Sequence, residues 1–208
     1  MYPKSVQKLI ELFTKFPGIG PRQAARFAFF ILKGNKDFLS DLISSLKSLQ
    51  EGVGFCTLCF RSMERIESNV HCNLCRDDKR EKTLIAVVEK ESDLHNMEKT
   101  NAYRGIYHVL GGVISPLDPD SPKKIHLREL HARVTEALSK NGDCEVILAT
   151  NPTAEGDTTA LYIDRVLAPL KEQHPKLKIS RLGRGLSLGS ELEHVDEVTL
   201  KSALTNRK

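Results

Sequence analysis

Four cysteines occupy positions at which their sulfur atoms could hold a metal ion together. They form two Cys-x-x-Cys pairs, Cys56 with Cys59 and Cys72 with Cys75, and twelve residues separate the pairs. Two such pairs build a tetrahedral thiolate cage of the kind that binds zinc. A zinc ion held by four sulfurs has no open position for water or substrate, so its role would be structural. We therefore predict one structural zinc ion per chain.

Two disulfides are the alternative use of these cysteines. The fifth cysteine, Cys144, has no pair, and the sequence opens without a hydrophobic leader, so we expect a reducing, cytoplasmic location. His71 lies beside Cys72, and adjacency alone does not make it a ligand. The longest apolar runs, 27–32 and 84–88, fall far short of the roughly 20 residues that cross a bilayer. We expect no membrane partner.

A helical hairpin is predicted at the N-terminus. Apolar residues recur with helical spacing over 5–16 and 22–33, and the intervening turn reads Pro-Gly-Ile-Gly-Pro. Gly18 and Gly20 tolerate positive φ and let a backbone approach an anion closely. A third amphipathic stretch, 38–49, is expected to pack over the hairpin as core.

The second helix of this hairpin has the charge to bind DNA phosphates. Arg22 and Arg26 are four residues apart and share a face, and the amides and dipole of the helix N-terminus add to their positive field. Residues 1–55 hold eight Lys or Arg against four Asp or Glu, whereas the remainder balances at 23 against 23, so the whole net charge of +4 lies in this quarter. A polyanion partner fits this excess, and an ordinary solvated hairpin is the alternative.

The rest of the chain is predicted to be an α/β domain with a mainly parallel sheet. Short β-rich runs alternate with helical segments, a pattern typical of right-handed crossovers. The predicted strands are 84–88, 106–110, 145–149 and 177–182, and the predicted helices are 92–99, 127–138 and 158–170. Ligands of such sheets bind at the carboxyl ends of the strands. Glu89 directly follows the first strand, and the segment Asn-Pro-Thr-Ala-Glu-Gly-Asp, 151–157, follows the third.

These acidic positions resemble the toprim domain, the Mg²⁺-dependent fold of topoisomerases and bacterial primases. Catalytic members carry Asp-x-Asp after this third strand and a glutamate after the first. Here the glutamate is Glu89, Asn151 and Thr153 replace the two aspartates, and Glu155 with Gly156 is retained. Mg²⁺ is commonly held by carboxylates, so the resemblance implies that Mg²⁺ binding is weak or lost and that no residue is catalytic.

A helix-hairpin-helix, a four-cysteine zinc finger and a degenerate toprim domain, in this order, resemble the RecR family of bacterial recombination mediators. The resemblance implies a ring-like homo-oligomer, commonly a tetramer, that clamps single- and double-stranded DNA without sequence preference. It also implies work with RecO, and in many bacteria RecF, to load RecA on gapped single strands. By position, Arg22, Arg26, Gly18 and Gly20 would contact DNA, and Glu89, Glu155 and Asp157 would form the acidic region that meets RecO.

The resemblance divides the chain into four parts. They are the helix-hairpin-helix at 1–52, the zinc finger at 53–80, the toprim domain at 81–175, and a strand, glycine-rich loop and helix at 176–208. The loop departs from the family's usual Ala-His-Gly-x-Pro-x-Gly-Gly. It reads Leu-Gly-Arg-Gly-Leu-Ser-Leu-Gly-Ser over 182–190 and carries Arg184. A turn or subunit-packing role is expected for it.

Two other functions fit parts of the pattern. An active toprim nuclease or topoisomerase would cut DNA with a divalent metal, and the chain shows no evident nucleophilic tyrosine beside the acidic site. A zinc-containing adaptor that meets only proteins would not retain DNA, and the basic N-terminus favours the DNA-binding alternative.

Overall fold

The structure is a computed structural model, and it describes residues 2–66, 69–183, 185–186, 189–205 and 207. The chain divides into two compact units, residues 1–53 and 54–208.

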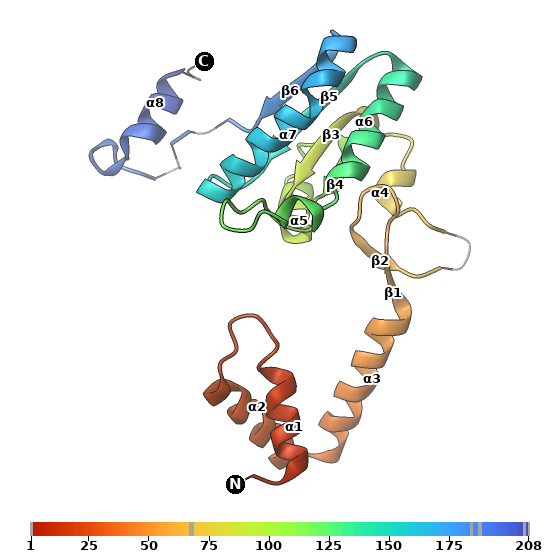
Figure 1. The fold of residues 1–208 in the computed structure, drawn as a ribbon, viewed down its shortest axis with the longest axis vertical. Coiled ribbons are helices and arrows are strands. Elements are labelled where there is room, and N and C mark those ends of the chain that lie inside the picture. The colour runs from red at the N-terminus through yellow and green to blue at the C-terminus, as the bar shows by residue number, and fades with distance from the viewer. Residues whose placement is uncertain (1, 67–68, 184, 187–188, 206, 208) are drawn as a thin grey trace. The chain divides into compact units, whose positions relative to one another are not determined.

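The first unit contains three helices, α1 (Lys4–Phe13), α2 (Pro21–Lys33) and α3 (Lys36–Gly52). Helices α1 and α2 form the predicted hairpin (Figure 1). In the turn, Gly18 has φ +76°, a left-handed conformation that favours glycine, whereas Gly20 is extended with φ −83° and caps α2. Only one of the two glycines therefore needs positive φ. Pro21 is the first residue of α2, where its missing N–H leaves no helical hydrogen bond unmade.

The prediction that the apolar stripe of residues 38–49 on helix α3 forms core is wrong. None of its residues is buried, and Ile43, Leu46 and Leu49 are 47%, 57% and 62% exposed. Its aromatic contact with the hairpin pairs Phe30 of α2 with Phe38 at a ring distance of 5.7 Å. The predicted helix is confirmed, but within the described first unit its apolar residues are not buried.

The second unit begins with a small module that carries the four cysteines. Strands β1 (Val53–Phe55) and β2 (Ser62–Glu64) pair as a hairpin, and the short helix α4 (Asn73–Arg76) follows. Three of the cysteines, Cys56, Cys59 and Cys72, are buried and form the centre of a small hydrophobic cluster of their own. Among the described residues of the module, the buried hydrophobic cluster is centred on these cysteines, so the fold of the module depends on what the sulfurs bind.

A four-stranded parallel sheet follows, as the alternating pattern predicted (Figure 1). The strand order is β4-β3-β5-β6, so β3 and β5 lie at the centre. The elements are β3 (Glu81–Val88), α5 (Glu91–Lys99), β4 (Gly105–Val109), α6 (Leu127–Asn141), β5 (Cys144–Ala149), α7 (Ala154–Gln173) and β6 (Leu177–Arg181). A 3₁₀ turn, η1 (Ser121–Lys123), precedes α6.

The two faces of the sheet are covered differently. On one face Ile85, Val87 and Val146 pack against α6 and α7, and Cys144 is buried in this same core. On the other face Ala86 and Val88 pack against α5 and against residues of the cysteine module. The module is thus part of the cover of the sheet. That tertiary role was not evident from the cysteine spacing.

The last elements are the 3₁₀ turn η2 (Leu192–His194) and helix α8 (Glu197–Thr205). Arg184, the residue that marks the altered loop, lies outside the described residues, as do 187–188. Across the described ranges, the helices are too short or too polar to cross a membrane.

His108, in β4, makes the stability of this fold sensitive to acid. It is completely buried, and burial lowers its pKa to about 3, while Nε2 lies 2.7 Å from the carbonyl oxygen of His126. The unfolded chain takes up a proton near pH 6.5 and the folded chain does not, so stability present above pH 6.5 is lost as pH falls toward 3.

We predict that this proton accounts for about 1.4 kcal/mol of unfolding free energy between pH 7.5 and 5.5. His108→Gln should be less stable than wild type at neutral pH. Between pH 7.5 and 5.5 its unfolding free energy should fall by about 1.4 kcal/mol less than that of wild type. Urea unfolding of both proteins at the two pH values measures the difference. Equal pH slopes would contradict the prediction.

Candidate zinc centre and nucleic-acid interface

The four cysteines of the two Cys-x-x-Cys pairs converge on one point. Their sulfur atoms all lie within 4.8 Å of one another, and Cys59 Sγ is 3.5 Å from Cys72 Sγ. The backbone N–H of Cys72 donates to Cys56 Sγ at 3.3 Å. The hydrogen bonds of the neighbouring thiols, that of Cys59 first, hold the pKa of Cys56 well below its ordinary value, which favours a thiolate there. Sequence spacing alone found this site.

The donor set fits zinc and does not fit disulfides. All five cysteines of the chain are free, and the 3.5 Å separation of Cys59 and Cys72 is far longer than the roughly 2.05 Å of a disulfide bond. A tetrahedral ion with Zn–S distances of about 2.3 Å places its sulfurs about 3.8 Å apart. The buried cluster is thus consistent with a structural zinc site. His71 is not part of it.

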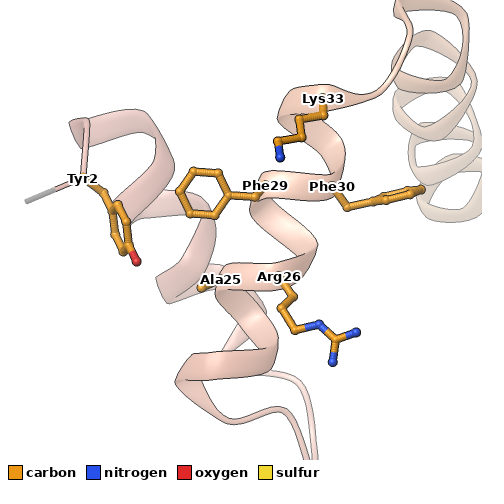
Figure 2. A pocket seen from close by; sticks show the side chains of 6 residues that line it. All are labelled: Tyr2, Ala25, Arg26, Phe29, Phe30 and Lys33. Carbon is orange, nitrogen blue, oxygen red and sulfur yellow. The ribbon is translucent and has the colours of Figure 1, made fainter.

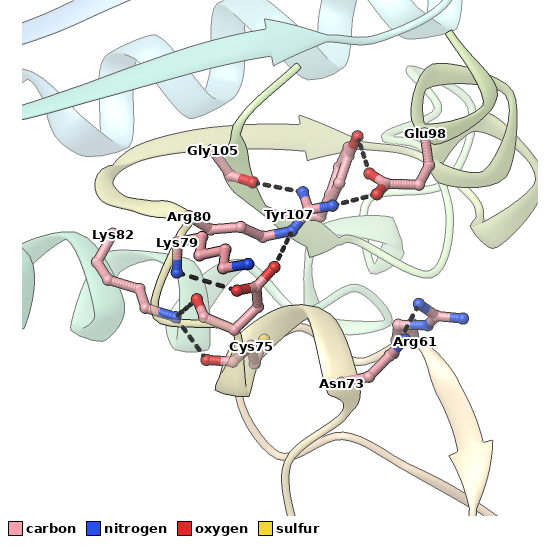
Figure 3. Close-up of polar contacts among 10 residues, drawn as sticks. Arg61, Asn73, Cys75, Lys79, Arg80, Lys82, Glu98, Gly105 and Tyr107 are labelled. Carbon is pink, nitrogen blue, oxygen red and sulfur yellow. Dashed lines mark hydrogen bonds and ion pairs between the residues drawn. The ribbon is translucent and has the colours of Figure 1, made fainter. Parts of the chain in front are cut away.

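Polar contacts fasten the second cysteine pair to the sheet, as Figure 3 shows. Lys82 of β3 donates to the carbonyl oxygens of Cys75 at 2.9 Å and Asp77 at 2.6 Å. Arg80 donates to the carbonyl oxygen of Gly105 at 2.9 Å and forms an ion pair with Glu98 of α5. The backbone after Cys75 is therefore held by the start of β3, and these polar contacts join the cysteine module to the sheet domain.

The predicted DNA-contact residues lie together on the hairpin. Arg22 and Arg26 are exposed on α2, one turn apart, and within the described part of the chain neither forms an ion pair. Apart from the adjoining residues of the chain, no described atom lies within 4 Å of where a Cβ would sit at Gly18 or Gly20, so the turn is open to an approaching ligand. Side chains, amides and turn thus present one accessible basic surface.

An open aromatic hollow of about 380 Å³ lies beside this surface. Figure 2 shows Arg26 and Lys33 flanking Phe30 on α2, with Phe29 turned toward Tyr2. The rings of Tyr2 and Phe29 meet edge to face at 5.3 Å. Phe30 is 64% exposed, so the aromatic surface of α2 is largely uncovered in one chain.

The acidic positions of the toprim-like sheet meet at the carboxyl ends of β3 and β5, as the strand order requires. Glu89 is buried at 3% exposure, and its carboxylate accepts hydrogen bonds from the backbone N–H of Asn151 at 2.7 Å and from Asn151 Nδ2 at 2.6 Å. The side-chain amide of Asn151 therefore occupies one oxygen of Glu89 and the backbone amide occupies the other. Sequence reasoning treated Asn151 as a lost metal ligand and missed its role as a donor.

This burial corrects the prediction that Glu89 belongs to a partner-binding surface. A carboxylate with so little exposed surface cannot reach another protein. Glu155 is exposed, and Asp157 is partly exposed and pairs with Arg181 at 3.3 Å. The acidic group predicted from sequence therefore splits into one internal and two external carboxylates.

Helix α7 begins four residues earlier than predicted and includes Glu155 and Asp157 in its first turn. Thr153 caps it by accepting from the Gly156 N–H at 3.1 Å. A Cβ at Gly156 would lie 2.1 Å from the Asn151 carbonyl oxygen and 2.7 Å from Glu89 Oε1. The glycine therefore permits the close approach of α7 to the Glu89–Asn151 pair.

We predict that Asn151→Asp destabilises the protein by about 3 kcal/mol, because it removes a donor to a buried carboxylate and adds a second negative charge beside it. Urea unfolding measures this free energy, and Asn96→Asp, at an exposed position of α5, is the matched control. Mg²⁺ should restore part of the loss, since adjacent carboxylates suit a hard cation. Equal stability of the two variants would refute the role given to Asn151.

Comparisons with known proteins match the helical hairpin, the sheet domain and the C-terminal segment in the same order. The model "RecR, helix-hairpin-helix" matches residues 6–49, the model "Toprim domain" matches 83–183, and the model "RecR, C-terminal" matches 185–208. The chain is 42% identical over 207 residues to "Recombination protein RecR" of Cutibacterium acnes, covering 100% of this chain and 96% of that protein. It is 44% identical over 206 residues to the protein of the same name from Prochlorococcus marinus strain AS9601, covering 99% and 96%.

Proposed function

The chain belongs to the RecR family of recombination proteins, and from this premise we propose that it is a non-enzymatic DNA clamp of recombinational repair. In this role it would bind DNA of any sequence and help RecO, and RecF where present, to load RecA on gapped single strands. The observation that supports DNA binding most directly is the exposed pair Arg22 and Arg26 at the N-terminus of α2, beside an open glycine turn.

Contacts of this kind would read the phosphate backbone and not the bases. Backbone amides and the dipole at a helix N-terminus attract anions, and arginine side chains reach phosphate oxygens. Such contacts position a protein on DNA without selecting a sequence. The charge excess of residues 1–55 adds to the same local field.

We propose that the working form is a homo-oligomer, commonly a tetrameric ring in this family. Val6, Ala24 and Ala28 are the buried apolar residues of the described part of the first unit, which is too little core for about 50 residues. Its exposed apolar side chains, on α2 and α3, match what an obligate interface requires, and a second copy of the chain is their proposed cover. Several hairpins around one ring would then bind one DNA molecule multivalently.

The toprim-like site supports a non-enzymatic role. Two-metal phosphoryl transfer requires carboxylates free to hold the ions, whereas Glu89 already accepts two hydrogen bonds from Asn151. The exposed Glu155 and the partly exposed Asp157, at the first turn of α7, are the proposed contact for RecO. A basic patch on that partner would complement them.

Zinc is the proposed ion of the four-cysteine cluster, one per chain, held by Cys56, Cys59, Cys72 and Cys75. With four thiolates the ion would stabilise the fold and supply no reactive water. The sheet is the element that would benefit, because the module covers part of its face.

Binding of the wild-type oligomer to labelled single- and double-stranded DNA, titrated over increasing salt with and without Mg²⁺, tests the proposal. We expect sequence-independent binding that weakens steeply with salt, because each neutralised phosphate releases counterion. Light scattering of the same samples gives the oligomer mass. Mg²⁺-dependent cleavage that is lost in Glu155→Ala, or absence of binding at low salt, would reject it.

A further inference from the structure

One cation of the sheet domain reaches the cysteine cluster from outside the zinc module. Arg133 lies on α6, 58 residues beyond Cys75 in sequence, and its Nη2 donates to Cys75 Sγ at 3.8 Å. Among the described residues it is the charged side chain with a hydrogen bond to one of the four sulfurs. No local motif marks it, because the contact exists only in the folded domain.

The same guanidinium also holds the first cysteine pair and the sheet. Its Nη1 donates to the carbonyl oxygen of Leu58 at 2.9 Å, inside the Cys-x-x-Cys of Cys56 and Cys59, and also to the carbonyl oxygen of Tyr107 in β4. Arginine presents five donors in one rigid plane, so a single side chain can reach three partners in a fixed geometry. Arg133 therefore connects both halves of the zinc site to β4.

Charge explains why a cation suits this position. Four thiolates around Zn²⁺ carry a net charge of about −2. This charge is largely shielded from water here, since Cys56, Cys59 and Cys72 are between 0% and 2% exposed. Charge in a poorly solvated site needs a paired countercharge, and hydrogen bonds from surrounding residues orient metal ligands and tune them.

Docking of the module does not depend on Arg133 alone. The ring of Phe60 stacks on His126 at 3.9 Å, and the Val109 N–H donates to the carbonyl oxygen of Cys59 at 2.9 Å. These contacts touch no sulfur. What distinguishes Arg133 is positive charge directed at a ligand atom.

We propose that Arg133 is a positioning residue of the zinc site, which compensates the thiolate charge through Cys75 and slows release of the ion. This inference rests on the zinc occupancy proposed above. It predicts that the toprim-like domain contributes directly to metal retention in the finger, so the two modules are coupled through one side chain.

The test compares zinc release from the full-length protein to a colorimetric chelator in wild type, Arg133→Gln, Arg133→Lys and two controls. Arg128→Gln changes an exposed arginine of the same helix, and His126→Ala removes a docking ring and keeps Arg133. We expect Arg133→Gln to release zinc about 10–100-fold faster, the usual range for loss of an outer-shell partner. Arg133→Lys should recover part of the retention, and Arg128→Gln should match wild type.

Cobalt substitution separates an electronic effect on sulfur from loosened docking. In Arg133→Gln the sulfur-to-cobalt charge-transfer band should move to longer wavelength, because a thiolate without its cationic donor is easier to oxidise, and His126→Ala should leave the band in place. If Arg133→Gln is insoluble, Arg133→Lys tests the same prediction, and its charge-transfer band should move to longer wavelength by a smaller amount. If Arg133→Gln releases zinc and absorbs light as wild type does, or as His126→Ala does, the inference about Arg133 is wrong while the zinc proposal stands. A wild-type protein that holds no zinc would overturn the zinc proposal with it.

Discussion

Cys59→Ser is expected to yield protein that retains little zinc, is poorly soluble and unfolds at a markedly lower temperature. Structural zinc contributes about 10–16 kcal/mol of binding free energy in zinc-finger peptides, and this free energy is coupled to folding. Cys59 is 1% exposed at the centre of the cluster, and the buried core of the module's described residues is built around the four sulfurs that would hold the ion.

The loss should spread beyond the finger. Phe60 and Leu74 of the module pack against the sheet face that carries Ala86, Val88 and Tyr107, so an unfolded finger uncovers apolar surface of the main domain. Metal analysis, size-exclusion chromatography and a melting curve measure these effects. Cys144→Ala, which removes a buried thiol outside the cluster, is the matched control and should keep its zinc. A zinc-free Cys59→Ser protein of normal size and stability would contradict the prediction.

The double variant Arg22→Ala/Arg26→Ala is expected to bind DNA far more weakly at moderate salt, equally for all sequences. Each phosphate interaction that the variant no longer makes lowers the slope of log affinity against log salt by about 0.9 on duplex DNA. The substitutions remove two such interactions from each hairpin, and every hairpin that touches the same DNA is affected. The affinity of an oligomer should therefore fall by more than about two orders of magnitude.

Fluorescence anisotropy across a salt series measures affinity and slope together. The control is Arg128→Ala/Arg165→Ala, which removes the same charge from exposed positions of α6 and α7. That protein should bind DNA almost as wild type does, and both variants should keep the wild-type melting temperature because all four arginines are exposed. Unchanged DNA binding by Arg22→Ala/Arg26→Ala would show that the hairpin is not part of the DNA interface.

Features that depend on short stretches of sequence were predicted well. The cysteine pairs, the Pro-Gly-Ile-Gly-Pro turn and the alternation of strands and helices depend on residues close in sequence, and the sulfur cluster, Gly18 at φ +76° and the parallel sheet match them. Helix α7 was predicted to begin too late. Its first turn holds a glycine and two acidic residues, whose pattern is typical of a loop unless a cap such as Thr153 is recognised.

Contacts between distant segments decided the rest. The amide of Asn151 and the carboxylate of Glu89 are 62 residues apart, and only the pairing of β3 with β5 brings them together. Exposure likewise depends on the partner surface that the fold provides. The apolar stripe of α3 has the period of a buried helix, yet none of the described residues of α3 is buried.

From its own residues the sequence determined a cysteine cage suited to zinc, a basic hairpin and a parallel α/β domain, because periodicity, spacing and turn chemistry are local properties of a chain. Tertiary structure alone decided that Glu89 faces inward, that Arg133 reaches Cys75 and that the zinc module covers the sheet. These relations depend on which surfaces meet after folding. The chemistry of each group depends on its burial and its hydrogen bonds, and these depend on distances between atoms in the folded chain. Separation along the sequence does not specify those distances.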